Sequence, residues 1–214
     1  MKRSGSSCQP NRLPVAAEIL LASSNEGKLA EFRALARNSA VSVGLELFPH
    51  FDQIPTFEES APTFGENSLG KALYYSQHTE ALVLADDSGL VVPSLDGRPG
   101  VHSARYAGEN ATSAQKIEKL LGEMEGKEGA ARAAHFVCAL SLVRQNRALA
   151  VITARAEGEI LESQRGAGGF GYDPIFLFPP LGKTFAELTA EQKNQHSHRG
   201  KAFRRLLAVL VDML

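Results

Sequence analysis

The chain has 214 residues, of which 43% are apolar and 22% charged, and its formal net charge is -1. This composition is typical of one globular domain or two closely packed lobes, and the balanced charge gives no overall field that would attract nucleic acid or an anionic membrane. The polar segment 1–14 lacks the apolar region of a secretory signal, and no apolar run approaches the ~20 residues that span a bilayer. We therefore expect neither nucleic acid nor a membrane as a partner.

The two cysteines stand in unrelated surroundings. Cys8 belongs to a polar N-terminal arm, which we predict to be disordered over residues 1–17, and Cys138 lies in an apolar run of the single domain predicted for residues 18–214. Two such cysteines predict neither a disulfide framework nor a zinc site. A reducing, cytoplasmic location fits them best.

Apolar periodicity predicts strands mixed with helices along the rest of the chain. Strands are expected at residues 18–22, 41–48, 81–85, 133–143, 149–157 and 175–178. Helices are expected from residue 27, from 64 to about 78, from 112 to a stop near 126, and from about 200 onwards, and residues 189–192 are expected to cap a further short helix. The two long strands are separated by a short polar turn, which predicts an antiparallel pair. Together these elements predict an α/β fold with a mixed sheet.

Asp86 and Asp87 are the most informative pair of residues. They follow the apolar run 81–85 and precede a second apolar run at 90–92, so we expect them at the end of a buried strand. Two neighbouring carboxylates repel each other and lose hydration there, which stability alone does not explain. A divalent cation would neutralise them, and carboxylates combined with a phosphorylated substrate suit Mg²⁺.

A small polar loop connects the first predicted strand to the first helix. Backbone N–H groups at the start of a helix bind phosphate, and Lys28 adds a positive charge there. A plain N-cap formed by Ser24 or Asn25, with a surface lysine, explains the same residues, and the spacing is not that of a P-loop. The candidate phosphate contacts are Ser23, Ser24, Asn25, Glu26, Gly27 and Lys28.

Acidic residues that could complete a metal site precede the second helix. Glu58 and Glu59 lie in a polar loop, where a solvated acidic pair is the alternative interpretation. Glu66 follows Thr63 by three residues, which indicates a capping box more than a metal ligand. Lys71 has no acid four residues before or after it, so a phosphate contact competes with an exposed position.

Two later segments could hold a nucleoside. Residues 166–174 combine four glycines with two aromatic residues and an acid. Glycine permits close backbone approach and an aromatic ring can stack on a base, although a glycine-rich turn with inward aromatic side chains is equally compatible. His198 and Arg199 precede the last predicted helix, and a guanidinium suits a base carbonyl or a phosphate.

Six segments of the sequence resemble, in order, the motifs of the inosine triphosphate pyrophosphatase family. They are SSNEGK, TFGENSLGKA, ADDSGL, PGVHSARYAG, GGFGYDPIF and SHRGKAF, and the resemblance covers residues 19–210 approximately. It implies an elongated mixed β-sheet with flanking helices, two lobes around a substrate cleft, and usually a homodimer. It also implies cleavage of ITP, dITP or XTP to the monophosphate and pyrophosphate with Mg²⁺, which cleanses the nucleotide pool.

The resemblance implies roles for individual residues. Asp87 would be proton acceptor and metal ligand, with Glu59 as the second metal ligand. Pro62 stands where the family often has a glycine-bearing loop, which leaves Glu58 as the alternative to Glu59. Besides Ser23 to Lys28, the substrate contacts would be Lys71, Ser88, Phe170, Gly171, Tyr172, Asp173, Lys193, His198 and Arg199.

The expected mechanism is hydrolysis at the α-phosphorus. Asp87, with or without Asp86, would take a proton from the attacking water, while Lys28 and Lys71 stabilise the departing pyrophosphate. Arg199 would favour the C6 oxygen of hypoxanthine and xanthine over the amino group of adenine. Two alternatives stay open: a Maf-type pyrophosphatase acting on other nucleotides, and a non-catalytic nucleotide-binding protein of the same fold.

Overall fold

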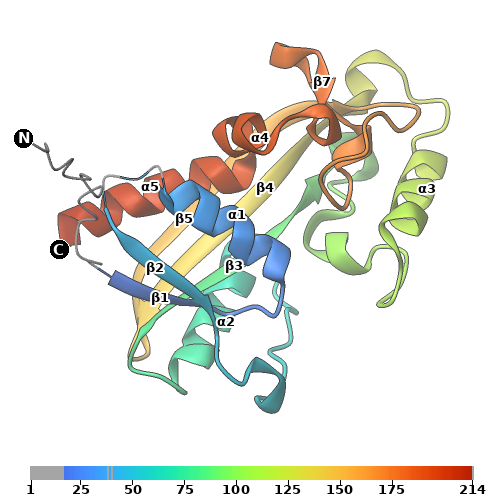
Figure 1. Ribbon diagram of the computed structural model, residues 1–214. Helices are drawn as coiled ribbons and strands as arrows, with labels where there is room; N and C mark the ends of the chain where they lie inside the picture. Colours follow the sequence, from blue (N-terminus) through green and yellow to red (C-terminus); the bar gives the residue numbers. More distant parts are fainter. Residues whose placement is uncertain (1–16, 38, 40, 214) are drawn as a thin grey trace, which may run out of the picture.

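The computed structural model describes residues 17–37, 39 and 41–213, so Cys8 and most of the predicted N-terminal arm lie outside the described residues. Seven strands form one mixed sheet in the order β2-β1-β3-β4-β5-β6-β7, with helices on both faces (Figure 1). β1 pairs in parallel with β2 and β3, and the other neighbours pair antiparallel. The predicted α/β fold with a mixed sheet is confirmed.

The element bounds follow the apolar pattern closely. The strands are β1 (Ala17–Leu21), β2 (Val43–Leu47), β3 (Leu82–Val91), β4 (Ala133–Arg144), β5 (Arg147–Ile160), β6 (Phe176–Phe178) and β7 (Lys183–Thr184). The α-helices are α1 (Glu26–Arg37), α2 (Phe64–Ser76), α3 (Ser113–Glu123), α4 (Ala190–His196) and α5 (His198–Met213). The 3-10 helices are η1 (Phe51–Gln53), η2 (Pro93–Leu95), η3 (Gly100–Arg105), η4 (Gly129–Arg132), η5 (Asp173–Ile175), η6 (Pro179–Leu181) and η7 (Phe185–Glu187). Ala17, assigned to the arm from sequence, is the first residue of β1.

Side-chain caps and one tight turn explain where several elements begin and end. The Thr112 hydroxyl accepts a hydrogen bond from the Gln115 backbone N–H in a reciprocal capping box at the start of α3, and Thr189 does the same at α4. Caps of this kind satisfy donors that a helix leaves free in its first turn. The β4–β5 hairpin turns at Gln145 and Asn146, which adopt φ values of 47° and 61°. Left-handed backbone at both central positions matches the twist of a two-residue hairpin.

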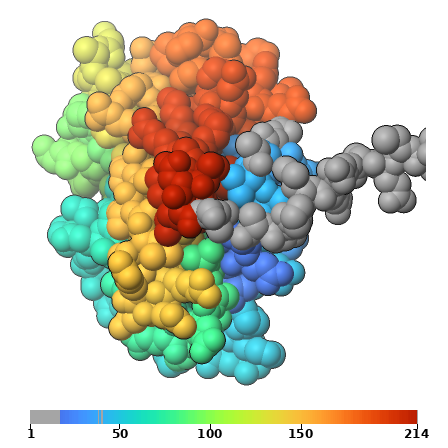
Figure 2. Space-filling model, turned by 90° about the vertical axis from the view of Figure 1, so that its left-hand side faces the viewer, coloured from blue at the N-terminus to red at the C-terminus, as the bar shows by residue number. Residues whose placement is uncertain are grey.

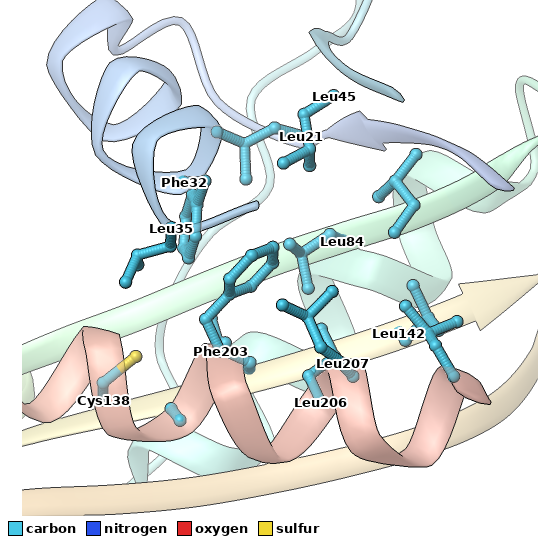
Figure 3. Packing of buried hydrophobic residues seen from close by; sticks show 14 of the residues in the cluster. Leu21, Phe32, Leu35, Leu45, Leu84, Cys138, Leu142, Phe203, Leu206 and Leu207 are labelled. Carbon is cyan, nitrogen blue, oxygen red and sulfur yellow. The ribbon is translucent and has the colours of Figure 1, made fainter. Parts of the chain in front are cut away.

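Two helical layers sandwich the β1 side of the sheet. On one face α1 and α5 pack together, with the rings of Phe32 and Phe203 5.0 Å apart. Figure 3 shows this cluster, in which the two helices cover Leu84 of β3 and Leu142 of β4. On the other face α2 packs against Val83 and Ala85. Figure 2 shows the carboxyl end of α5 (red) at the surface beside the β4–β5 hairpin (yellow).

A separate apolar cluster fills the other half of the molecule. It surrounds the far ends of β3, β4 and β5 and includes α3, with Leu90, Phe136 and Phe176 buried in its interior. The rings of Phe136 and Phe176 lie 4.6 Å apart. Within the described residues, no helix combines the length and the apolar character needed to cross a membrane.

Among the predicted boundaries that differ from the structure, two bear on the site. β3 continues without a break from Leu82 to Val91, so Asp86 and Asp87 lie in the middle of a strand and not at its end. Aspartate has low strand propensity, but β4 pairs with this whole segment, Asp86 opposite Leu140 and Asp87 opposite Ala139. Pairing with a long apolar neighbour overrides local preference. The last helix begins at His198, two residues before the predicted start.

The sheet splits at the middle of β3. β1 pairs with β3 only as far as Leu84, where the backbone N–H of Ala22 closes the ladder. Among the described residues, no strand pairs with the segment 85–90 of β3 on that side. The two acids therefore lie on an open strand edge, next to the loop that carries the chain from β1 into α1.

Candidate active site

Asp86 and Asp87 contact elements on opposite faces of the sheet, as the alternation of side chains along a strand requires. Oδ2 of Asp86 lies 3.0 Å from Nζ of Lys28 in α1 and 3.1 Å from Nη2 of Arg199 in α5. Asp87 instead faces α2, where its surroundings include Asn67 and Glu59. Asp86 is thus neutralised by cations of the protein itself, and only Asp87 keeps the character expected of a metal-binding acid.

The environment of Asp86 stabilises its ionised form. Burial alone would raise its pKa, but the charges of Arg199 and Lys28 outweigh burial and hold the pKa well below the usual range. The Ser88 hydroxyl and the Cys138 thiol also donate hydrogen bonds to Oδ1 of Asp86. A buried carboxylate with this set of donors is a permanent anion, which cannot exchange protons near neutral pH.

Asp87 has the opposite character. Burial, and then the negative charge of Glu59, raise the pKa of Asp87 to about 6, and the amide of Asn67 only partly offsets them. Its Oδ2 atom is buried and has no hydrogen-bond partner among the residues that the structure describes. A carboxyl group whose pKa lies near neutrality can accept a proton from water and is the kind of group that acts as a general base.

Asp87 and Glu59 also fit a Mg²⁺ ion. A bound cation would relieve the repulsion between the two carboxylates and give the unpartnered oxygen of Asp87 a ligand. Glu59 is held in place by Lys71, whose Nζ lies 2.6 Å from its Oε1. Within the described residues, no group of three or more His, Cys, Asp or Glu side chains forms a metal cluster. Two carboxylates completed by substrate phosphates are typical of Mg²⁺ sites.

A cavity of about 630 Å³ opens beside the split in the sheet. It is bounded by the β1–α1 loop, the open segment of β3, α3, the 169–173 loop and the first turn of α5. Its lining brings together many predicted substrate contacts, namely Asn25, Gly27, Lys28, Ser88, Phe170, Gly171, Tyr172, Asp173, Lys193, His198 and Arg199. This volume lies within the range of small-molecule sites.

The β1–α1 loop contains the N-cap expected by one of its two interpretations, but not the surface lysine. The Asn25 side chain accepts a hydrogen bond from the Lys28 backbone N–H at 3.0 Å, and the Ser23 hydroxyl accepts one from the Asn25 N–H at 3.1 Å. Asn25 is therefore the N-cap of α1. Lys28 is not the surface lysine of that interpretation, because its Nζ pairs with Asp86 and the side chain is only 21% exposed.

A buried ion pair fixes the glycine-rich loop. Oδ2 of Asp173 accepts hydrogen bonds from Nζ of Lys193 at 2.6 Å and from the Phe170 backbone N–H at 2.8 Å. Gly169, at φ 71°, approaches the same carboxylate so closely that a Cβ atom would collide with it. The loop holds the Phe170 ring 51% exposed, with Lys193 Nζ 4.4 Å from the ring centroid. Phe170 is thus available to a planar ligand.

The other aromatic residue of this loop turns inward. Tyr172 is buried, and its hydroxyl donates a hydrogen bond to the Ser103 carbonyl at 3.1 Å. Phe170 is therefore exposed, as stacking on a base would require. Tyr172 is part of the core, as expected for a glycine-rich turn with inward aromatic side chains.

His198 and Arg199 occupy the first turn of α5 and are both buried. The His198 ring stacks on Phe136, with centroids 4.7 Å apart, and its Nδ1 has no hydrogen-bond partner. Burial, and then the charge of Arg199, keep the pKa of His198 well below its usual value, so the imidazole is neutral. Arg199 also donates from Nη1 to Glu31 at 2.6 Å, so most of its five N–H groups are already engaged.

Several predicted residues lie away from the cavity. Ser23, Ser24 and Glu26 are not in its lining. Asp87 and Glu59 are not in it either, because they lie on the α2 side of the sheet, where Lys71 pairs with Glu59. Glu58 is exposed, and Glu66 accepts a hydrogen bond from the Thr63 hydroxyl at the start of α2, as a capping residue should.

Sequence reasoning missed other participants. Glu31 supports Arg199, and its position three residues after Lys28 on one face of α1 could have signalled a shared role. Phe136 forms the wall under His198, but its strand pattern marks it only as a core residue. Ser113 and Lys116 of α3 also line the cavity, although neither belongs to a motif singled out in the sequence.

The fold and the site define an α/β protein with a cavity rich in basic and aromatic side chains, beside a buried acid with a raised pKa. Comparison with known proteins gives the family. The Ham1 family model matches residues 19–209. The chain therefore belongs to the Ham1 family, which its sequence motifs had indicated.

Individual relatives match over most of their length. A dITP/XTP pyrophosphatase of Geobacillus kaustophilus is 49% identical over 189 residues, which cover 88% of this chain and 92% of that protein. One from Desulfotalea psychrophila is 42% identical, covering 89% and 83%. Among solved structures, a HAM1 protein from Coxiella burnetii has a TM-score of 0.81 at 41% identity, covering 92% of this chain and 99% of the other.

Proposed function

We propose that the protein hydrolyses dITP, XTP and ITP to the corresponding monophosphate and pyrophosphate. The observation that carries the proposal is the buried Asp87 carboxylate on the open edge of β3, beside the cation-lined cavity. Among the described residues its Oδ2 atom has no hydrogen-bond partner, and its pKa is raised to about 6. The names of the curated relatives support the substrate class. The assignment makes the protein a nucleoside triphosphate pyrophosphatase, a hydrolase of nucleotide metabolism.

In this proposal the substrate binds on one face of β3, and the general base lies on the other. The purine ring of the substrate lies in the cavity near Phe170 and the His198 ring, and its phosphates extend past Lys28 toward the open edge of β3. Asp87 accepts the proton of the water that attacks the α-phosphorus, the bond from that phosphorus to the bridging oxygen breaks, and pyrophosphate leaves with the bond electrons. Lys28 lies at the start of α1, where positive charge stabilises the leaving group.

Mg²⁺ is the proposed cofactor, with Asp87 and Glu59 as its protein ligands. When bound, the ion would neutralise part of the triphosphate charge and polarise the phosphorus. Lys71 positions Glu59 through their ion pair, so a role in placing the metal ligand joins the phosphate contact predicted for this lysine. Burial, and then repulsion by Glu59, raise the pKa of Asp87, and the repulsion supports this assignment because a cation would remove it.

Base selection is proposed to combine Arg199 with the neighbouring loop. Since Asp86 and Glu31 engage most of the guanidinium, few of its N–H groups stay free for a C6 oxygen. Lys193 and the unpartnered Nδ1 of His198 are further groups that can meet the base. A donor facing a C6 oxygen rewards hypoxanthine and xanthine, whereas it stays unpaired against the amino group of adenine.

The test is pyrophosphate release from ITP, dITP, XTP, GTP and ATP measured side by side with Mg²⁺, and again with excess EDTA. We expect the first three to be preferred, the products to be monophosphate and pyrophosphate, and EDTA to abolish turnover. Diphosphate and orthophosphate as products would refute attack at the α-phosphorus. Preference for other nucleotides would favour a Maf-type activity, and binding without turnover a non-catalytic protein.

A homodimer in the cytoplasm is the proposed state of the protein. The dimer rests on the family resemblance, and the cytoplasmic location on the free, buried Cys138, which suits a reducing compartment. Light scattering of the purified protein tests the dimer, since a mass of 23.0 kDa in solution would refute it.

A further inference from the structure

The basic side chains of the cavity differ in how their charge is balanced. Lys28, Lys193 and Arg199 each contact a carboxylate at 3.1 Å or less, as described above. The carboxylates involved are Asp86, Asp173 and Glu31, one for each of these cations. These carboxylates offset part of the positive charge that the three cations offer to a ligand, although a triphosphate is strongly anionic.

Lys116 is the exception among the basic residues of the cavity lining. It forms no ion pair with any carboxylate in the part of the chain that the structure describes, and its Nζ donates only to the Ala104 carbonyl, at 3.2 Å. A neutral carbonyl is a weaker acceptor for an ammonium group than a phosphate oxygen, since charge-assisted hydrogen bonds are about twice as strong. Lys116 already lines the cavity, so little rearrangement would bring its ammonium group to a ligand there.

The position of Lys116 complements that of Lys28. Lys28 comes from α1 on the β1 side of the split sheet, whereas Lys116 comes from α3 in the other half of the molecule (Figure 1). Ser113, one turn earlier on α3, also lines the cavity. We propose that Lys116 binds the polyphosphate chain of the substrate from the α3 side. This inference rests on the proposed function, because it assumes a nucleoside triphosphate in the cavity.

Lys119 is a matched control on the same helix. It lies one turn after Lys116, is exposed, and likewise donates to a backbone carbonyl of the preceding segment, Tyr106, at 2.8 Å. It is absent from the cavity lining. Lys116→Ala and Lys119→Ala therefore remove the same charge from the same helix, and only the first removes it from the cavity. Lys116→Arg keeps the charge.

The experiment is a calorimetric titration of inosine, IMP, ITP and inorganic tripolyphosphate in EDTA, which prevents turnover. We expect Lys116→Ala to weaken ITP and tripolyphosphate binding about tenfold or more, the scale of a lost hydrogen bond to a charged group. Inosine binding should change less than about twofold, which a general distortion of the site would not permit. Lys116→Arg should restore most of the ITP affinity, and Lys119→Ala should match wild type.

Other outcomes overturn the inference. Unchanged ITP affinity in Lys116→Ala removes the lysine from the site, and equal weakening of inosine and ITP assigns it to the nucleoside or to the fold. A wild-type protein that binds neither ITP nor tripolyphosphate refutes the inference directly. Wild-type protein that binds ITP without releasing pyrophosphate in Mg²⁺ refutes the proposed hydrolysis alone, and the binding comparison still decides the role of Lys116.

Discussion

Asp86 and Asp87 are adjacent in β3, yet one is a permanent anion and the other a carboxyl group that titrates near neutrality. Lys28 and Arg199 hold the first in its ionised form from the α1 and α5 face. Burial and Glu59 destabilise the ionised form of the second on the α2 face. Asp86 therefore holds the basic side chains in place, whereas Asp87 is the candidate general base. Substitutions at Asp86 should mainly affect stability, and substitutions at Asp87 should mainly affect turnover.

Asp87→Asn should lose turnover while keeping the fold. The amide has the shape of the carboxyl group but cannot accept the proton, so kcat for dITP should fall by about 10²- to 10⁴-fold, the usual contribution of a general base. Affinity for the nucleotide in EDTA should change little. Asp86→Asn is the comparison, because it leaves Arg199 and Lys28 without their shared partner and should mainly lower the melting temperature. Near-normal kcat in folded Asp87→Asn would show that another residue is the general base.

The stability of the metal-free protein should respond to pH through Asp87. Its folded-state pKa of about 6 exceeds the ordinary value of 3.8, so the folded protein keeps a proton that the unfolded chain has lost. This contribution to stability is complete below about pH 4 and is lost as pH rises to about 6. Asp87→Asn has no such loss. Its free energy of unfolding, relative to that of wild type, should therefore rise with pH by about 3 kcal/mol at most.

Urea unfolding of both proteins in EDTA at pH 5 and pH 8 measures this difference. Adding Mg²⁺ at pH 8 should stabilise wild type and leave Asp87→Asn nearly unchanged, because the ion would balance the ionised carboxylate. If the two proteins differ in free energy of unfolding by the same amount at pH 5 and pH 8, the raised pKa of Asp87 is contradicted.

Arg199→Ala should destabilise the protein before it changes base selection. The side chain is 3% exposed and balances both Asp86 and Glu31, so its removal leaves buried carboxylates short of a partner. Breaking a buried pair from one side costs roughly 3–5 kcal/mol. Arg205→Ala is a control on the exposed side of α5 and should stay within about 0.5 kcal/mol of wild type.

A double substitution separates charge from packing. Adding Asp86→Asn to Arg199→Ala removes one stranded carboxylate and should recover part of the lost stability in urea unfolding. If Arg199→Ala is as stable as wild type, the ion network contributes nothing measurable, and the arginine is free to be tested for base selection by the ratio of kcat/KM for ITP and ATP.

The aromatic residues of the 169–173 loop should separate binding from stability. Phe170→Ala should raise KM for dITP and leave the melting temperature near wild type, because the ring is half exposed and available for stacking. Tyr172→Phe should cost roughly 0.5–1.5 kcal/mol, since it removes one buried hydrogen bond to the Ser103 carbonyl, and should leave KM unchanged. The reverse pattern would show that the loop presents Tyr172 to the nucleotide.

The fold was largely predictable because its elements carry strong local signals. The capping residues Thr112 and Thr189 placed two helix starts correctly, and the polar turn at Gln145 and Asn146 predicted the long hairpin. β3 was harder, because two aspartates inside a strand contradict local propensity and only the pairing with β4 explains them. Periodicity also cannot reveal that a neighbouring strand stops at Leu21 and leaves an edge open.

The site was predicted unevenly for a related reason. Motif resemblance found Lys28, Phe170 and Arg199, which line one cavity. It could not show that Arg199 is engaged by Glu31, since that contact joins α1 to α5 across 168 residues of sequence. Lys116 carries no motif at all, and only its position on the cavity wall, without a carboxylate partner, distinguishes it from an ordinary surface lysine.

The continuity of β3, β4 and β5 through both apolar clusters limits how the cavity can open. β4 packs Leu142 in the cluster under α1 and α5 and Phe136 in the cluster around α3, with no linker between them. The two halves therefore cannot swing about a flexible hinge. A movement of one half against the other must bend or twist these three strands together, so the stiffness of the sheet limits how far such a movement can open the cavity to a nucleotide.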